Sequence, residues 1–229
     1  MNFYAHAVVA EMQRADAEFV LGAMLPDLAA MAGLRVQGTD AVTLGEGMQL
    51  HHESDRAFHA CEAFTTLTRE GAHDLRGAGL RRGPALGAAH VGIELLLDGW
   101  LVAERPPSTV YRHALERAAS CSDTVRWRGR AGESWQRLCR RISSSAATEG
   151  CRDPDEVARR TARALERRPR LRLTERERAP LGRWLQDVRA RVAHHGPALI
   201  DAVAPRGAGK SGASESSLHS ARPNRGGSS

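Results

Sequence analysis

A run of apolar residues from Ala85 to Val102 constrains the fold of this 229-residue chain more than any other segment. It is too long for one β-strand and is bounded by Pro84 and Pro106, so it predicts a central helix buried on nearly all sides. Glu94 and Asp98 lie inside it. Charges in a buried helix are costly unless they are paired or bind a metal ion. The alternative is that one or both acids face solvent or pair with arginines.

Metal-capable side chains recur at a four-residue spacing in two segments, as His51, Asp55 and His59 and then as His90, Glu94 and Asp98. Residues four apart lie on one stripe of an α-helix, so two facing stripes could hold a metal ion. Residues eight apart are separated by about 12 Å along the helix axis, so His59 is not expected to share an ion with His51. We therefore expect either two metal ions or a supporting role for His59 and His90.

Imidazole and carboxylate ligands without thiolate suit Mn²⁺, Mg²⁺, Fe²⁺ or Zn²⁺, and the spacing does not choose among these ions. The four cysteines, Cys61, Cys121, Cys139 and Cys151, show neither C-x-x-C spacing nor a disulfide framework. The sequence has no leader-like N-terminus and no uninterrupted apolar stretch of the roughly 18 residues that a membrane span needs. We expect a soluble protein of the reducing cytoplasm.

Hydrophobic residues make up 41% of the chain and aromatic residues only 4%, so the core must consist mainly of Leu, Ala and Val, a composition that suits helices. Periodicity predicts helices over residues 46–69, 85–102, 108–120, 131–146, 154–167 and 174–203, with loops over 33–46 and 71–84. Asp153 with Pro154 predicts one helix start, and Thr174 with Glu177 predicts a capping box.

These patterns predict an all-α fold, with one helical bundle of six to eight helices over residues 1–205. Strand-like alternation of convincing length is not found. Residues 206–229 are rich in Gly and Ser and poor in apolar side chains, so they cannot offset their ordering entropy by burial. We expect a disordered tail there.

The charge is unevenly distributed along the chain, whose net charge is +6. Residues 1–100 carry 7 Arg and 13 acidic residues, a net charge of −6, whereas residues 159–205 carry 12 Arg and 5 acidic residues, a net charge of +7. A cationic surface attracts nucleic acid, phosphorylated ligands or an acidic protein. The alternative is that the arginines reflect the base composition of the genome.

Five segments have a pattern in common with one enzyme family. They are MNFYAH at the start, VLGAMLPDL around Asp27, GMQLHHESD around His51 and Asp55, IELLLDGWL around Asp98, and LERRPRL at residues 165–171. In this order, over roughly residues 1–175, the chain resembles the bacterial acyl carrier protein phosphodiesterases. That family is an all-α, divergent branch of the HD-domain metal-dependent phosphohydrolases.

The resemblance implies a function in lipid metabolism, namely hydrolysis of the phosphodiester that joins 4′-phosphopantetheine to a serine of holo acyl carrier protein. It implies a divalent ion, typically Mn²⁺, bound by His51, Asp55, Glu94 and Asp98. Asp27 would complete the coordination or accept the proton of a bound water. His6 would orient a ligand or protonate the leaving serine oxygen, although a structural core histidine is the alternative reading.

Arg167, Arg168 and Arg170 are the candidate contacts for phosphate or for the acidic carrier protein, because guanidinium groups match phosphate oxygens. A solvated helix end is the alternative reading of this cluster.

The chain departs from the family pattern at three points. HHESD stands where the family has H-R-R-I-D, Gly99 stands where it has His, and Glu94 stands where it has Asp. These departures motivate an alternative function, a catalytically inactive helical domain that binds an acidic protein or nucleic acid through its arginine-rich C-terminal half. The lack of a helix-turn-helix or RNA-binding aromatic motif argues against nucleic acid.

Overall fold

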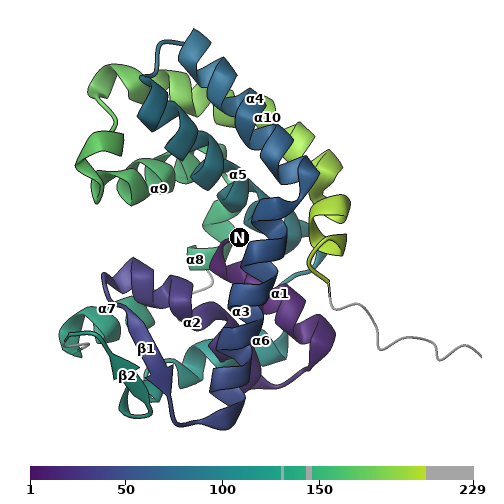
Figure 1. Cartoon of the computed structure of the whole chain (residues 1–229), viewed down its shortest axis with the longest axis vertical. Helices are drawn as coiled ribbons and strands as arrows, with labels where there is room; N and C mark the ends of the chain where they lie inside the picture. The colour runs from purple at the N-terminus through teal and green to yellow at the C-terminus, as the bar shows by residue number, and fades with distance from the viewer. Residues whose placement is uncertain (130–131, 143–145, 205–229) are drawn as a thin grey trace, which may run out of the picture.

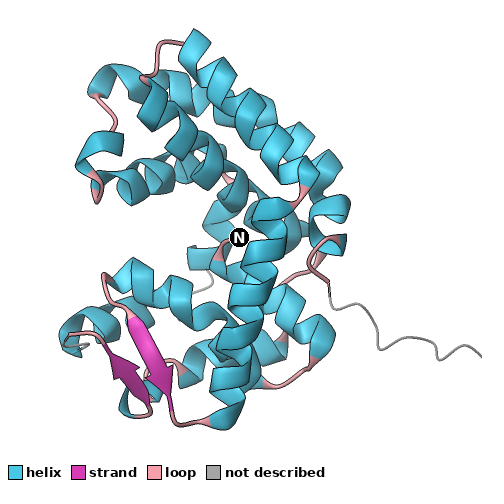
Figure 2. Ribbon diagram, in the orientation of Figure 1, coloured by secondary structure: helices cyan, strands magenta, loops and turns pink. Residues whose placement is uncertain are grey.

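A computed structural model describes residues 1–129, 132–142 and 146–204, and its elements are helical apart from two short strands (Figures 1 and 2). The all-α prediction is confirmed, and the described residues form more helices than the six to eight expected. The predicted tail, residues 206–229, lies outside the described residues.

The elements are α1 Phe3–Gln13, α2 Ala17–Ala32, β1 Val36–Thr39, α3 Val42–Ala60, α4 Glu62–Gly77, α5 Arg82–Glu104, α6 Thr109–Arg117, η1 Cys121–Asp123, β2 Val125–Trp127, α7 Gly132–Ile142, α8 Ala146–Glu149, η2 Gly150–Arg152, α9 Pro154–Glu166, η3 Pro169–Leu171 and α10 Glu175–Asp201.

Helix α5 is the predicted central helix. It is 23 residues long, begins two residues before Pro84, and buries residues on all of its faces. By length and composition it could also cross a membrane, but 67% of its apolar window is buried inside the protein, as in the core helix of a folded domain. Its inward-facing apolar side chains join one continuous hydrophobic core.

The helices form two groups that meet near the N-terminus (Figure 1). Helices α4, α5, α9 and α10 pack on one another, while α2 packs on α1, α3, α6 and α7. Helix α1 contacts α5 and α3, so it joins the two groups. The four helices that carry the predicted metal-capable residues, α1, α2, α3 and α5, therefore converge at one junction.

Two expected loops and one expected helix differ from the structure. The helix predicted over residues 46–69 is interrupted at Cys61, whose φ of −65° and ψ of 131° are extended, and α3 and α4 lie on either side. The loop expected over residues 33–46 contains β1 and the first turn of α3, and that expected over 71–84 contains the end of α4. Strand β1 pairs antiparallel with β2, with Thr39 opposite Val125. Strands of three and four residues are too short to show alternation in the sequence.

Glycines set the contact between α2 and α3. A Cβ atom on Gly22 would lie 2.2 Å from the carbonyl oxygen of Leu44, and one on Gly47 would lie 2.1 Å from that of Phe19. Both obstructing atoms belong to helix backbone, which cannot turn aside as a side chain can. The two helices therefore cross with their backbones in contact, and this crossing fixes the distance between the residues that they carry.

The predicted helix starts are confirmed. The side chain of Asp153 accepts a hydrogen bond from the amide of Asp155, and Thr174 and Glu177 form the capping box of α10. The Glu177 carboxylate also accepts hydrogen bonds from the amide and the guanidinium of Arg81, at 2.9 and 3.0 Å. Arg81 immediately precedes α5, so Glu177 ties the starts of α5 and α10 together.

Replacing Glu177 with Gln should lower the free energy of unfolding at pH 7 by about 1 kcal/mol, because partly buried donors of Arg81 and Thr174 lose a charged acceptor. Hydrogen bonding to Arg81 lowers the pKa of Glu177 to about 2 from its ordinary 4.5. The stabilisation is therefore complete above pH 4.5 and is lost as the pH falls toward 2. In denaturant titrations, the difference in free energy of unfolding between variant and wild type should shrink as the pH falls from 4.5 toward 2. Glu175→Gln, at an exposed site on the same helix, is the control. A stability difference between Glu177→Gln and wild type that does not change with pH would contradict the role given to the Glu177 carboxylate.

Candidate metal centre

The structure brings metal-capable side chains into two adjacent groups. In each group, one potential ligand atom per residue lies within 4.8 Å of the others. The inner group consists of His6, Asp27 and His51, and the outer group of His59, His90 and Glu94. The chain therefore has groups of His, Asp and Glu side chains that could bind a metal ion.

In the inner group, hydrogen bonding fixes which nitrogen of His6 carries the proton. The Ser54 hydroxyl donates to the carbonyl oxygens of Leu50 and His51, at 2.8 and 3.1 Å. Its oxygen is therefore left to accept from Nδ1 of His6, at 3.2 Å. Burial lowers the pKa of His6 to about 4, so the ring is neutral at physiological pH. Its Nε2 atom accordingly presents a lone pair.

The second imidazole of the inner group, His51, is held in the same way. Its Nδ1 lies 2.9 Å from the carbonyl oxygen of Ala23, which can only accept, so Nδ1 carries the proton and Nε2 presents a lone pair. Burial lowers the pKa of His51 to about 3. Metal-binding histidines commonly donate one ring N–H to an oxygen and ligate through the other nitrogen. His6 and His51 both have this arrangement.

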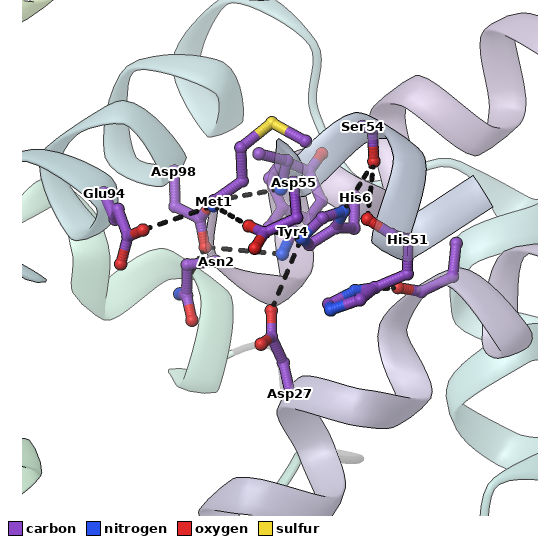
Figure 3. A network of polar contacts seen from close by, with 12 residues as sticks. Met1, Asn2, Tyr4, His6, Asp27, His51, Ser54, Asp55, Glu94 and Asp98 are labelled. Atoms are coloured by element: carbon purple, nitrogen blue, oxygen red, sulfur yellow. Dashed lines mark hydrogen bonds and ion pairs between the residues drawn. The ribbon is translucent and has the colours of Figure 1, made fainter. Parts of the chain in front are cut away.

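The ligand-type atoms of the inner group face one another without a direct hydrogen bond (Figure 3). Nε2 of His6 lies 3.8 Å from Oδ2 of Asp27 and 3.8 Å from Oδ1 of Asp55. Both His6 Nε2 and Asp27 Oδ2 are buried without a hydrogen-bond partner. Burial raises the pKa of Asp27 well above its ordinary value. Buried polar atoms are normally satisfied, so a lone pair opposite two carboxylates is the environment expected of a cation site.

The outer group is closer to the surface. Oε1 of Glu94 lies 3.1 Å from Nε2 of His59 and 3.2 Å from Nε2 of His90. The other ring nitrogen of His59, Nδ1, lies 3.2 Å from Oδ2 of Asp55. Its hydrogen bonds with Asp55 and Glu94 raise the pKa of His59 to about 9. His59 and His51, eight residues apart on α3, fall in different groups.

The amino group of Met1 lies between the two groups, 2.7 Å from Oδ1 of Asp55 and 3.2 Å from Oε1 of Glu94 (Figure 3). Burial alone would lower the pKa of this amino group, but Glu94 and Asp55 outweigh burial and raise it. Both carboxylates therefore contact a positive charge at the junction in this structure.

Asp98 belongs to neither group. Its buried carboxylate accepts hydrogen bonds from the amide of Ala5 at 2.9 Å and from the side chain of Asn2 at 2.6 Å. These donors lie at the start of α1, where an anion also interacts favourably with the helix dipole. Burial raises the pKa of Asp98 to about 7 against the opposing effect of these donors. We therefore assign Asp98 the role of anchoring α1, which carries His6, against α5.

The predicted arginine cluster is divided in the structure. Arg167 donates hydrogen bonds to the carbonyl oxygens of Ala30 and Met31 at the end of α2, so it joins α9 to α2. Arg168 and Arg170 are exposed. Gly99 has a packing role, because a Cβ there would lie 2.0 Å from the carbonyl oxygen of Cys151. The backbone of η2 thus occupies the space that a histidine at this position would need.

A surface cavity of about 530 Å³ lies beside α3 and the strands and includes Met48, His52, Arg56 and Arg126 in its lining. It contains none of the residues of either group. The metal-capable residues reach the surface instead through half-buried side chains, with Asp27 26% and Asp55 34% exposed.

Comparisons with protein-family models, with curated proteins and with solved structures give no match. The assignments above therefore rest on the geometry of the chain itself. Helical spacing singled out His51, Asp55 and Glu94 as candidate metal ligands. It did not reveal that Ser54 orients His6, and the sequence shows only that Ser54 lies three residues after His51 on α3. A serine at this spacing from a histidine is common in helices, so it does not predict such a role.

Proposed function

We propose that this protein is a divalent-metal-dependent phosphodiesterase whose ion binds at the inner group. The observation that carries the proposal is the pair of buried, unpartnered atoms, His6 Nε2 and Asp27 Oδ2, that face each other at 3.8 Å. The two neutral imidazoles and the Asp27 carboxylate of this group, with the adjacent carboxylate of Asp55, match the ligands of Mn²⁺, Fe²⁺ and Zn²⁺. Mn²⁺ is the ion to test first, because it is the one that the sequence resemblance implies.

Each side chain of the inner group has a distinct task in this proposal. His6 and His51 offer lone pairs, and Ser54 and the Ala23 carbonyl keep both rings oriented. A bound divalent ion would supply a polarised phosphoryl oxygen and a water of lowered pKa. Asp27 is partly exposed and faces Nε2 of His6 at 3.8 Å, so its carboxylate would either join the ligands or accept a proton. This revises the sequence-based roles of His6 and Asp27 toward metal binding.

The proposed substrate is a phosphodiester on an acidic partner, with holo acyl carrier protein as the first to test. Exposed Arg168 and Arg170 offer charge complementarity to phosphate or to an acidic protein. The four cysteines are free thiols, and we also propose the cytoplasm as the location on the grounds of their pattern in the sequence.

The test is to remove metals with a chelator, add Mn²⁺, and assay holo acyl carrier protein and a generic aryl phosphodiester. We expect Mn²⁺-dependent loss of the 4′-phosphopantetheine mass from the carrier, and no loss in the presence of excess chelator. Hydrolysis of the aryl substrate alone would retain the reaction type and reject the carrier protein as substrate. Turnover of neither substrate by metal-loaded protein would overturn the proposal.

A second candidate function, a non-catalytic domain that binds an acidic partner, is favoured by a specific cluster of positive charge. Burial lowers the pKa of Arg141 on α7, and so does the proximity of Arg163, Arg160 and Arg167 on and after α9. Arg160 of this cluster is paired with Glu156 at 2.8 Å, and the net positive charge gathered from two helices suits an anionic ligand. Salt-sensitive binding of an acidic protein or of DNA by a protein that contains no metal would favour this function.

A further inference from the structure

We infer that His59, His90 and Glu94 form a second divalent-cation site, joined to the inner site through Asp55. This inference rests on the proposed function and deepens it, because it makes the centre binuclear. Three observations carry it: the distances within the outer group, the orientation of His59, and the position of Asp55 between the two groups.

The distances within the outer group suit one ion. Two ligands bound at about 2.1 Å in a tetrahedral arrangement lie about 3.4 Å apart. The contacts of Glu94 Oε1 with Nε2 of His59 and of His90 are 3.1 and 3.2 Å. His90 and Glu94 are one turn apart on α5, and His59 reaches them from α3. Two imidazoles and one carboxylate with open positions make up a common set for a catalytic ion.

Asp55 orients the ring of His59 for ligation through Nε2, and metal binding there would release the proton that the metal-free ring carries on that atom. Oδ2 of Asp55 lies 3.2 Å from Nδ1 of His59, on the side of the ring opposite the atom that faces Glu94. A carboxylate that accepts from one ring nitrogen of a histidine while the other binds metal is a recurrent arrangement, because it fixes the ring and strengthens the ligand. The imidazole rings of His59 and His90 are also stacked, with centroids 4.9 Å apart, which holds both nitrogens toward Glu94.

Asp55 faces both groups at once. Its Oδ1 lies 3.8 Å from Nε2 of His6, and its Oδ2 contacts His59. One carboxylate therefore contributes to the inner site and orients a ligand of the outer site. Metal binding at one site should accordingly influence the other, and the loss of Asp55 should weaken both.

The outer site also has access to solvent. His59 and His90 are 33% and 40% exposed, whereas His6 is buried. The outer ion would therefore exchange more readily and could contact a substrate phosphate directly. In paired-metal phosphoesterases two ions together stabilise the attacking and leaving oxygens.

The test uses the full-length protein, stripped of metal and titrated with Mn²⁺ by calorimetry, with electron paramagnetic resonance as a readout independent of activity. The variants are His90→Ala, at a half-exposed site that tolerates truncation, and Asp27→Asn, an isosteric change in the inner group. Circular dichroism and thermal melting confirm that each variant is folded. His73→Ala, in α4 and outside both groups, is the control for loss of an unrelated histidine.

We expect two equivalents of Mn²⁺ for wild type and for His73→Ala, and one equivalent for His90→Ala and for Asp27→Asn. Spin coupling is expected only in the two proteins that bind both ions, wild type and His73→Ala. If wild type binds one equivalent, and this ion is retained by His90→Ala but lost in Asp27→Asn, the second site is overturned and the proposed function stands. One equivalent that only His90→Ala loses would overturn the inner site, and the binuclear centre with it.

Discussion

Gly47→Ala is expected to lower the free energy of unfolding by about 3 kcal/mol, as for an overpacked core, and to weaken metal binding at the same time. The new methyl group would lie 2.1 Å from the carbonyl oxygen of Phe19 and 2.9 Å from the amide nitrogen of Ala23. Both atoms are backbone of α2, so relief requires α2 and α3 to separate. Separation would lengthen the 2.9 Å hydrogen bond between His51 and Ala23, which orients the His51 ring.

The chain provides a matched control two residues away. A Cβ on Gly45 would lie 3.5 Å from the Thr39 side chain, an ordinary contact, on the same helix. Gly45→Ala should be neutral or stabilising by up to about 1 kcal/mol, because alanine favours helix over glycine. Denaturant unfolding and Mn²⁺ calorimetry on both variants measure the two effects. Equal stability of Gly45→Ala and Gly47→Ala would show that the helices do not cross in backbone contact.

Asp27→Asn is expected to reduce Mn²⁺ affinity at the inner site and phosphodiesterase activity by at least about 100-fold, because an amide cannot replace an anionic ligand or accept a proton from water. In the absence of metal the same variant should be as stable as wild type or more so. Burial of the Asp27 carboxyl near Glu94 and Asp55 is unfavourable to its charged form, and the amide removes that penalty.

Thermal melts with and without Mn²⁺ separate these two effects. At an Mn²⁺ concentration about 100 times the dissociation constant, binding at one site adds about 2.7 kcal/mol to stability. Asp27→Asn should lose this increment at the inner site without any loss in the metal-free protein. Glu53→Gln, on the exposed side of α3, is the control and should behave as wild type. Destabilisation of metal-free Asp27→Asn would instead indicate that Asp27 is a structural residue.

The elements that could be predicted from the sequence are those whose signals are local. The apolar run around Glu94 predicted the central helix α5, and the residues at Asp153 and Thr174 predicted the starts of α9 and α10. The break at Cys61 was missed because neither Gly nor Pro marks it. The paired strands were missed because β1 and β2 are far apart in the sequence and very short.

The candidate site could be predicted only in part. Helical spacing selected His51 and Asp55 correctly as neighbours on α3, but it grouped Asp98 with Glu94, although the carboxylate of Asp98 turns to the start of α1. The periodicity of one helix does not predict which groups of a neighbouring helix lie beside its side chains. Spacing along one helix does not join His6 or Asp27 to His51, because the three residues lie on different helices. The alignment of Asp27 with His51 depends on the contact of Gly22 with Gly47, which is a tertiary feature.

The measurement that tests the central claim most directly is anomalous diffraction from crystals grown with Mn²⁺. The proposed centre predicts a peak about 2.0–2.6 Å from Nε2 of His6, from Nε2 of His51 and from a carboxylate oxygen of Asp27. A peak elsewhere, or a water molecule that hydrogen-bonds His6 to Asp27 in crystals saturated with Mn²⁺, would contradict the claim.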